Sequence, residues 1–349
     1  MANYPRYSVK YGVLLSSVVG VSLLAGCGGD GSSGGGSGST TASFAVTDAP
    51  VDDVESIKVT FSRLDLKPAQ GDPISVSLDE PVVIDNLLAL TGNAAAPIVN
   101  DIEVEPGEYQ WVRLYVDGGI PDSEVQPEVG NKLDLFIPGQ QNGNGNGNPR
   151  FLQLNTGFTI AAGSEADFTI DFVLRKGLTK PANSDYYLLR PAMRLVDNVE
   201  VGTITGTVDS AIPDSLACVE TDADYFGSVY LYEGDLTAEG SAEPDDVYDP
   251  GIESGSDDVQ DAAGERPVTT ANVVFDEDSA TLRYEIGFVR ANEEGYSLAY
   301  SCNAKGDDPA TDDDIPYTEV KYTTVEAGGT ATVDFSTVPE VPKEPEEGT

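Results

Sequence analysis

The chain contains no histidine, and this absence excludes much of enzyme chemistry. Histidine is the usual general base, the commonest metal ligand and the partner of serine and cysteine nucleophiles. Basic residues are also scarce, because 60 acids stand against 19 Lys and Arg, a formal net charge of −41. Such a chain repels nucleic acid and anionic lipid surfaces. We therefore expect neither a histidine-dependent enzyme nor a nucleic-acid-binding protein.

No catalytic motif lies in the structural context that its chemistry needs. Gly31–Gly35 matches the G-x-S-x-G of hydrolases, but it lies in a Gly/Ser-rich segment with no strand before it and no helix after it. A carboxylate-based glycan hydrolase needs only two acids and remains an alternative, although 60 acids single out no pair. We predict no catalytic residue and no enzyme activity.

The N-terminal apolar run is too short to be a transmembrane helix. It extends from Val13 to Leu24, well short of the roughly 20 residues that cross a bilayer. Two basic residues, Arg6 and Lys10, precede it, and small residues end it. This pattern is typical of a secretory signal peptide. We predict a signal peptide over residues 1–26.

The residues at the end of that run, Leu23-Leu24-Ala25-Gly26-Cys27, resemble the lipobox of bacterial lipoproteins. The resemblance implies cleavage after Gly26 and lipidation of Cys27, whose acyl chains would hold the protein at a membrane. Gly28, rather than aspartate, follows the cysteine, which in such lipoproteins favours export to the outer membrane. We expect a lipid-anchored outer-membrane protein that faces the periplasm or the cell surface. Ordinary signal cleavage beside an incidental cysteine is the alternative.

Cysteine is scarce too, with three residues in the chain. If Cys27 carries lipid, Cys218 and Cys302 remain, and an even pair in an exported protein predicts a disulfide. The bond would close a loop of 85 residues and stabilise the fold by several kcal/mol in the chain-entropy model.

The hydrophobic pattern has a period of two, which predicts strands. Ile57, Val59 and Phe61 alternate with polar residues, and Leu64 and Leu66 then have the opposite parity. A bulge or a bend near Ser62 and Arg63 is the simplest explanation of the shift.

Turn-forming residues separate the strand-like segments, and no segment has a convincing amphipathic helical pattern. We predict an all-β fold with two antiparallel β-sandwich domains after the signal peptide and a flexible tether. Residues from 203 onward hold 35 of the 60 acids. The expected order is a Gly/Ser-rich tether over 27–41, a sandwich over 42–200, an acidic sandwich with one disulfide over 201–337, and a disordered tail over 338–349.

Thr47-Asp48-Ala49-Pro50 resembles the opening of a family of exported bacterial domains of unknown function. The later segments 85–90, 107–114 and 189–194 fit the succession of strands in that family. The resemblance covers about residues 42–200 and implies a β-rich envelope domain with no assigned activity. The second unit is more loosely similar to carboxypeptidase-regulatory-like modules, on the strength of Gly295-Tyr296-Ser297-Leu298.

Calcium is the cofactor that the composition favours most, because it takes carboxylate and carbonyl oxygens. One loop clusters five candidate ligands, although their spacing is not that of an EF-hand: Asp307, Asp308, Asp312, Asp313 and Asp314. A solvated acidic loop without a metal is the alternative interpretation.

The segment Glu108–Val116 is the most specific candidate for a binding surface. Its even positions are apolar and should face the core, whereas its odd positions are Tyr109, Trp111, Arg113 and Tyr115, with the only tryptophan of the chain. Aromatic rings beside an arginine on an exposed sheet face are typical of recognition surfaces. The alternative is a central strand with both faces covered.

These observations predict a lipid-anchored binding protein of the envelope or surface, without catalytic activity, whose partner is a protein or a glycan. A structural or assembly component of the envelope is the main alternative, and the glycan hydrolase is the other.

Overall fold

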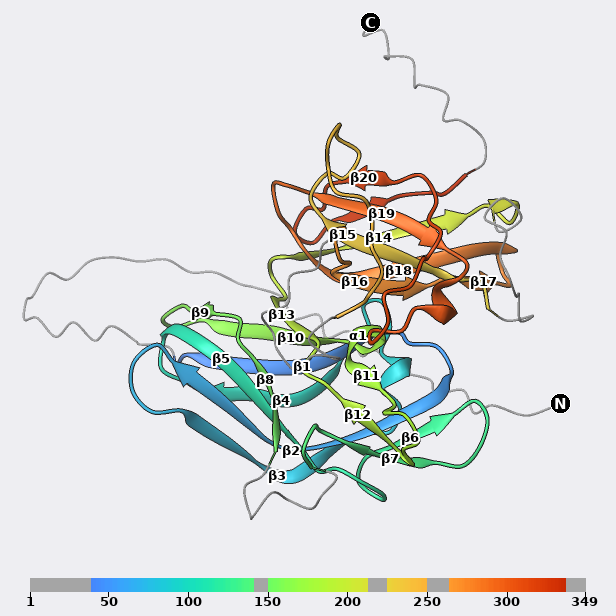
Figure 1. Ribbon diagram of the computed structural model, residues 1–349. Helices are drawn as coiled ribbons and strands as arrows, with labels where there is room; N and C mark the ends of the chain where they lie inside the picture. Colours follow the sequence, from blue (N-terminus) through green and yellow to red (C-terminus); the bar gives the residue numbers. More distant parts are fainter. Residues whose placement is uncertain (1–38, 141–149, 213–224, 250–263, 337–349) are drawn as a thin grey trace, which may run out of the picture. The chain divides into compact units, whose positions relative to one another are not determined.

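A computed structural model describes residues 39–140, 150–212, 225–249 and 264–336 (Figure 1). The predicted signal peptide, Cys27, most of the tether, Cys218 and the predicted tail lie outside the described residues. Contacts between residues group 38–349 into one compact unit. Among the described residues, no helix is both long and apolar enough to cross a membrane.

Two facing sheets make up the first part of the chain. One has the strand order β13-β10-β1-β4, and the other has the order β11-β12-β7-β6-β2-β5-β8, with β3 paired to β2 and β9 to β5. Their strands are β1 (Thr41–Ala49), β2 (Val54–Pro68), β3 (Ile74–Ile84), β4 (Ala96–Glu103), β5 (Gly107–Val116), β6 (Glu124–Pro127), β7 (Leu133–Phe136), β8 (Phe151–Leu154), β9 (Phe158–Ile160), β10 (Glu165–Val173), β11 (Leu178–Thr179), β12 (Tyr186–Leu189) and β13 (Met193–Asp197).

The long strand β2 shows why this sheet pair has a well-filled core. Ile57, Val59 and Phe61 are fully buried, and so are Leu64 and Leu66, although the two sets differ in parity. The pairing of β2 with β3 and with β5 shifts register between Phe61 and Arg63. This register shift bears out the predicted bulge or bend. The extra residue returns the apolar side chains to the core face after the phase of the sequence changes.

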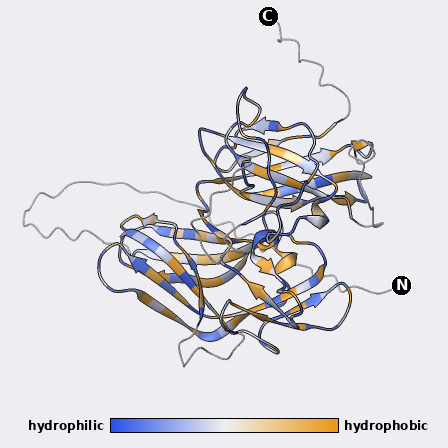
Figure 2. Cartoon of the chain, in the orientation of Figure 1, coloured by the Kyte–Doolittle hydropathy of each residue, from blue (hydrophilic) through white to orange (hydrophobic). Residues whose placement is uncertain are grey.

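A second pair of sheets follows, with the orders β17-β18-β14-β21 and β16-β15-β19-β20. Its strands are β14 (Val201–Val208), β15 (Ser228–Glu233), β16 (Thr269–Asn272), β17 (Val274–Asp276), β18 (Thr281–Arg290), β19 (Tyr296–Ser301), β20 (Lys321–Thr323) and β21 (Thr330–Thr332). All six residues of β19 are buried, and β15 is buried except at Glu233. In Figure 2 the apolar residues of this unit are concentrated on its strands.

The helices that lie wholly within the described residues are short turns: η1 (Leu87–Ala89), α1 (Leu174–Gly177) and η3 (Ala304–Gly306). The predicted all-β class is confirmed. The sheets are not purely antiparallel, because β1 pairs with β10, β12 with β7 and β14 with β21 in parallel. Alternation of apolar residues carries no information on strand direction, so the sequence pattern did not distinguish these pairs. The division of residues 42–337 into two separate domains near residue 200 stays a prediction.

Arg175 of α1 is the buried centre of the contact between the two sheet pairs. Its five N–H donors reach five acceptors within 3.3 Å. These acceptors are the carboxylate of Asp52, the carbonyl of Ala304 and the side chains of Ser228, Thr270 and Asn272. Four of the five belong to the second sheet pair or its loops. Because a buried guanidinium needs all its donors satisfied, this set holds the two sheet pairs in one arrangement.

Candidate functional site

The odd-numbered positions of β5 form a polar and aromatic surface on the outer face of their sheet. In the pairing of β2 with β5, Lys67 lies opposite Trp111, Asp65 opposite Arg113 and Arg63 opposite Tyr115. Strand β8 adds Gln153 beside Arg113 and Phe151 beside Tyr115. Paired residues share a face of a sheet, so these side chains meet away from the core. Beyond β2, the outer face of β3 carries the exposed residues Ser75 and Ser77.

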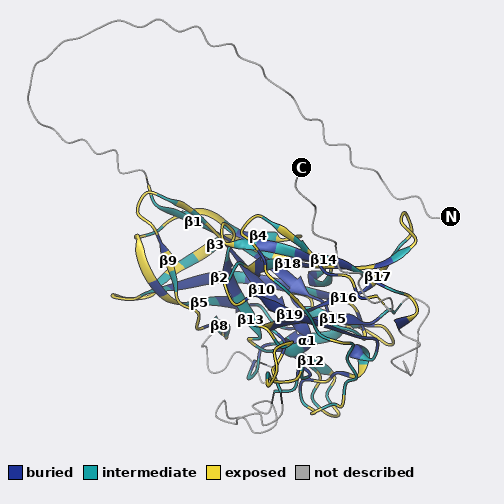
Figure 3. Ribbon diagram, turned by 90° about the horizontal axis from the view of Figure 1, so that it is seen from above, coloured by how far each residue is buried: buried dark blue, intermediate teal, exposed yellow. Residues whose placement is uncertain are grey.

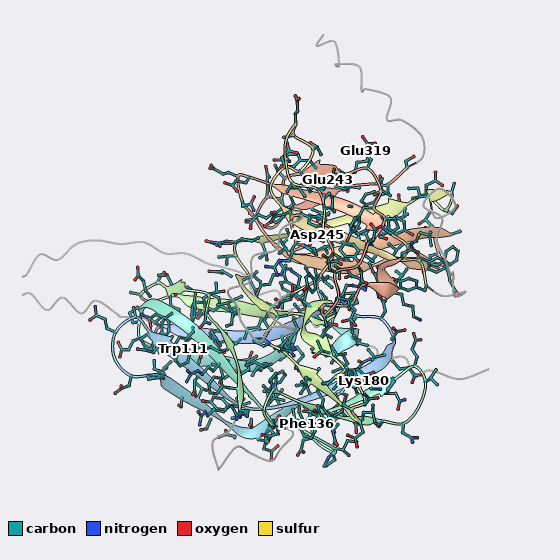
Figure 4. The ribbon with its side chains drawn as sticks, viewed as in Figure 1. Trp111, Phe136, Lys180, Glu243, Asp245 and Glu319 are labelled. Carbon is teal, nitrogen blue, oxygen red and sulfur yellow. The ribbon has the colours of Figure 1, made fainter. Side chains whose placement is uncertain are left out.

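Five of these side chains pack ring against guanidinium, and we call them the aromatic–arginine stack: Arg63, Trp111, Arg113, Tyr115 and Phe151. The Arg113 guanidinium lies 4.0 Å from the Trp111 ring centre and 4.2 Å from that of Phe151. Phe151 contacts Tyr115 with 5.3 Å between ring centres, and Arg63 lies 3.7 Å from the Tyr115 ring centre. Cation–π contacts of this kind fix planar groups in a defined order. Figure 4 marks the position of Trp111.

Hydrogen bonds to Gln153 and Asp65 fix three side chains of the stack in position. Arg113 Nε donates to Gln153 Oε1 at 2.6 Å, and the Tyr115 hydroxyl donates to Asp65 Oδ2 at 2.8 Å. Arg63 Nη2 donates to the same carboxylate oxygen at 2.8 Å. Burial, and next the hydrogen bond to Asp65, raise the pKa of Tyr115, so its hydroxyl stays protonated and donating. The stack is therefore preorganised at its Tyr115 end.

Exposure differs along the predicted surface. Trp111 and Arg113 are half-buried, Tyr115 is 6% exposed, and Tyr109 is 3% exposed and belongs to the core. The prediction that Tyr109 shares the outer surface is wrong. A register shift between Lys67 and Pro68 places Tyr109 opposite Pro68, on the core face, where its ring stacks on Phe158 at 5.0 Å.

Sequence reasoning missed four residues of this site: Arg63, Asp65, Phe151 and Gln153. The signal for the first two was present, because Arg63 and Asp65 alternate with the core residues Leu64 and Leu66 and so share the outer face. Their contact with Trp111 and Tyr115 depends on the pairing of β2 with β5, which no local pattern specifies.

The Thr-Asp-Ala-Pro segment lies at the end of β1 and into the following turn. Thr47 Oγ1 lies 2.7 Å from the carbonyl oxygen of Leu90 and 2.6 Å from that of Ala94, so its hydroxyl can donate a hydrogen bond to either. Asp48 is 4% exposed, and neither of its carboxylate oxygens has a hydrogen-bond partner among the described residues. Burial, and next the charge of Asp171, raise the pKa of Asp48 well above its ordinary value. This pattern favours a neutral carboxyl group that packs inside the fold.

The predicted calcium ligands are only partly brought together. Asp307 and Asp313 lie with Asp246, and Asp312 lies with Asp245 and Asp246, each set having carboxylate oxygens within 4.8 Å of one another. Neither set includes Asp308 or Asp314, which are exposed.

Sequence reasoning did not include Asp245 or Asp246, which come from a different acidic loop. Burial raises the pKa of Asp246 to about 6. The close carboxylates already accept protein hydrogen bonds, Asp307 from the Tyr230 hydroxyl and the amide of Val247, and Asp246 from the amides of Tyr248 and Asp313. Calcium binding stays a prediction.

Cys302 is 5% exposed just after β19. Its predicted partner, Cys218, lies outside the described residues, so the disulfide stays a prediction.

Comparisons with known proteins give a similarity to one family model over part of the chain and a weak structural likeness. No curated protein matches the chain. Among solved structures, the chain is similar to a candidate adhesin from Bacteroides ovatus ATCC 8483, with 11% identity and a TM-score of 0.20 over 93% of this chain and 100% of that one. A candidate cell adhesion protein from Bacteroides eggerthii DSM 20697 has 9% identity and a TM-score of 0.18 over 85% and 99%.

The family model covers residues 39–191 and is described as a domain of unknown function (DUF4382). This match bears out the predicted resemblance of the first unit to a domain of unknown function, and it does not extend to the second unit. Residues 39–191, which include the whole aromatic–arginine stack, are similar to this domain of unknown function.

Proposed function

We propose that this protein is a lipid-anchored binding protein of the bacterial envelope, without catalytic activity, whose binding surface is the aromatic–arginine stack. The observation that carries the proposal is the order of planar groups on one outer sheet face, with Arg113 between the Trp111 and Phe151 rings. The lipid on Cys27 would hold the protein at the outer membrane, and the partner would be a protein or a glycan of the envelope or surface.

Three features support a role in recognition. The half-buried Trp111 and Arg113 offer rigid area that loses little conformational entropy on binding. The guanidinium of Arg113 supplies a local positive charge on a chain with a net charge of −41, so the part of a partner that meets the stack would carry electronegative or π-electron-rich groups. The buried Tyr115–Asp65 hydrogen bond anchors the stack before any partner arrives.

The experiment compares Trp111→Ala with Ser75→Ala, a variant on the same outer face but outside the stack. Purified soluble protein without residues 1–38 is applied to isolated envelopes, to protease-treated envelopes and to extracted envelope glycan. We expect Trp111→Ala to lower binding at least tenfold while Ser75→Ala leaves it unchanged, because aromatic anchors carry much of the energy of an interface. Loss of binding after protease treatment would identify a protein partner, and binding to extracted glycan would identify a glycan.

Stability measurements make this test decisive. Urea unfolding of both variants should give midpoints close to that of the parent protein, since Trp111 is only half-buried. A Trp111→Ala variant that is folded and binds envelopes as well as the parent would overturn the proposal. The Cys27 part is tested separately: Cys27→Ala in the full chain should move the protein from the membrane fraction to the soluble fraction.

A further inference from the structure

A second surface feature, distant in the chain from the stack, is an open pocket of about 720 Å³. Its walls come from the turn after β1, from α1 and the segment through β12, and from the loop after η3. We call it the cationic pocket and define it by Arg175, Lys180, Tyr187, Arg190 and Lys305. Its volume is in the range of sites for small molecules. Figure 4 shows Lys180 well apart from Trp111, and Figure 3 shows α1 and β12 next to each other in a second view.

Basic side chains are concentrated in this pocket, which four acids also line: Asp52, Asp53, Asp307 and Asp308. Four of the 19 Lys and Arg of the chain line it: Arg175, Lys180, Arg190 and Lys305. Arg175 is neutralised by Asp52 at 2.6 Å, and Lys305 lies 3.2 Å from both Asp53 and Glu128. Within the part of the chain that the structure describes, no carboxylate lies within 4.0 Å of the charged nitrogens of Lys180 or Arg190. The chain has about three acids for every base, so most basic side chains would be expected to have an acidic partner. Lys180 and Arg190, on the same pocket, are exceptions to this expectation.

Arg190 is also held in position while keeping donors available. Its Nε donates to Thr179 Oγ1 at 3.3 Å, which fixes the guanidinium plane. Its two terminal nitrogens make no hydrogen bond within the described structure. A planar guanidinium with two parallel donors matches the geometry of a carboxylate.

An aromatic ring completes the wall. Lys180 Nζ lies 5.3 Å from the centre of the half-buried Tyr187 ring. Pro181 and Pro309 add apolar surface nearby. Ring faces of this kind pack against the C–H faces of sugars and other small cyclic molecules. The same wall carries Asp307 and Asp308, and these carboxylates disfavour a ligand with two negative charges on one group.

We propose that the cationic pocket binds a carboxylate-bearing sugar, with Arg190 and Lys180 on the carboxylate and Tyr187 against the sugar ring. One negative charge matches Lys180 and Arg190, whereas a phosphate dianion would be repelled by Asp307 and Asp308, which also line the pocket. The site is separate from the aromatic–arginine stack, so it gives the protein a second ligand class and does not depend on the proposed function of the stack.

Calorimetric titration of the soluble protein with galacturonate, glucose and glucose 6-phosphate tests the proposal. We expect binding of galacturonate, at least tenfold weaker binding of glucose 6-phosphate, and no binding of glucose. Arg190→Gln and Lys180→Gln should each weaken galacturonate binding at least tenfold. The matched control is Lys132→Gln, which removes the same charge from an exposed lysine paired with Glu124 elsewhere and should leave binding unchanged.

Several outcomes would overturn the proposal. The first is the absence of binding heat with galacturonate at millimolar concentration, and the second is tighter binding of glucose 6-phosphate than of galacturonate. The third is an equal loss of galacturonate affinity in Lys132→Gln, which would show that only the overall charge of the protein matters. Lys180 is exposed, so its variant should fold, and thermal unfolding of both variants checks this. Trp111→Ala should keep full galacturonate affinity, so failure of the stack proposal and failure of this one are distinguishable.

Discussion

Arg175 Nη1 donates to Asp52 Oδ2 at 2.6 Å, with only 2% and 7% of the two side chains exposed. Burial alone would lower the pKa of Arg175, but Asp52 and the nearby Tyr230 hold it above its usual value, so the guanidinium stays charged inside the protein. This pair joins the turn after β1 to α1, and the remaining Arg175 donors reach the second sheet pair. Arg175 is therefore a buried cation in the contact between the two sheet pairs, beside other links such as Arg194 to the carbonyls of Gly287 and Phe288.

Arg175→Met should destabilise the protein by about 3 to 5 kcal/mol, because it leaves the Asp52 carboxylate buried without its cation. Urea unfolding measures the loss. The double variant Arg175→Met with Asp52→Leu should recover part of it, since replacing both charges removes the unpaired carboxylate. The matched control is Arg290→Met, which breaks an exposed pair with Glu200 (66% and 53% exposed) and should cost under about 1 kcal/mol. Equal losses in Arg175→Met and Arg290→Met would contradict this account.

Tyr115→Phe should cost about 1 to 3 kcal/mol, because the buried Asp65 carboxylate loses a hydrogen bond at 2.8 Å while the ring stays in the stack. Denaturant unfolding is the measurement. Tyr322→Phe is the control, since Tyr322 is 40% exposed and its hydroxyl donates at 3.2 Å to the Glu294 carbonyl. A Tyr115→Phe variant no less stable than Tyr322→Phe would show that the hydroxyl does not anchor the stack.

Asp48→Asn should become more stable relative to the parent protein as pH rises. The folded pKa of Asp48 lies well above its unfolded value, near 3.9, so its contribution to stability is complete below the unfolded pKa. That contribution is lost as pH rises through the folded pKa. Thermal unfolding of both proteins from pH 4 to 8 gives the difference.

An opposite sign is expected for Asp276→Asn. Hydrogen bonds, first from Arg283, lower the pKa of Asp276 to about 2, so the parent loses its stability advantage over Asp276→Asn as pH falls from about 4 toward 2.

For Asp48, a difference in stability between the parent and Asp48→Asn that does not change from pH 4 to 8 would contradict its raised pKa.

Cys302→Ser should lower stability by several kcal/mol and abolish the response to reductant, if the predicted bond to Cys218 forms. Unfolding with and without dithiothreitol measures this, and mass spectrometry of peptides from unreduced protein should recover the Cys218–Cys302 pair. Unpaired thiols in protein exported from cells would rule out the disulfide.

Local patterns predicted the fold class and several details of the first sheet pair. The change of parity between Phe61 and Leu64 predicted the bulge in β2, because buried apolar residues must return to one face. The same rule placed Trp111 and Arg113 on the outer face. It was wrong for Tyr109, since the second register shift of β2 against β5 lies at Pro68 and no change of apolar parity marks it.

The sequence by itself determined the all-β class and the acidic character, because a period of two and a charge count are local properties. It also excluded histidine chemistry. Only the tertiary structure decided that Arg175 is buried, that Asp246 joins Asp307 and that Arg63 covers Tyr115. Each of these contacts joins residues more than 50 positions apart, and strand pairing at such distances depends on how the whole core is buried, which no local pattern encodes.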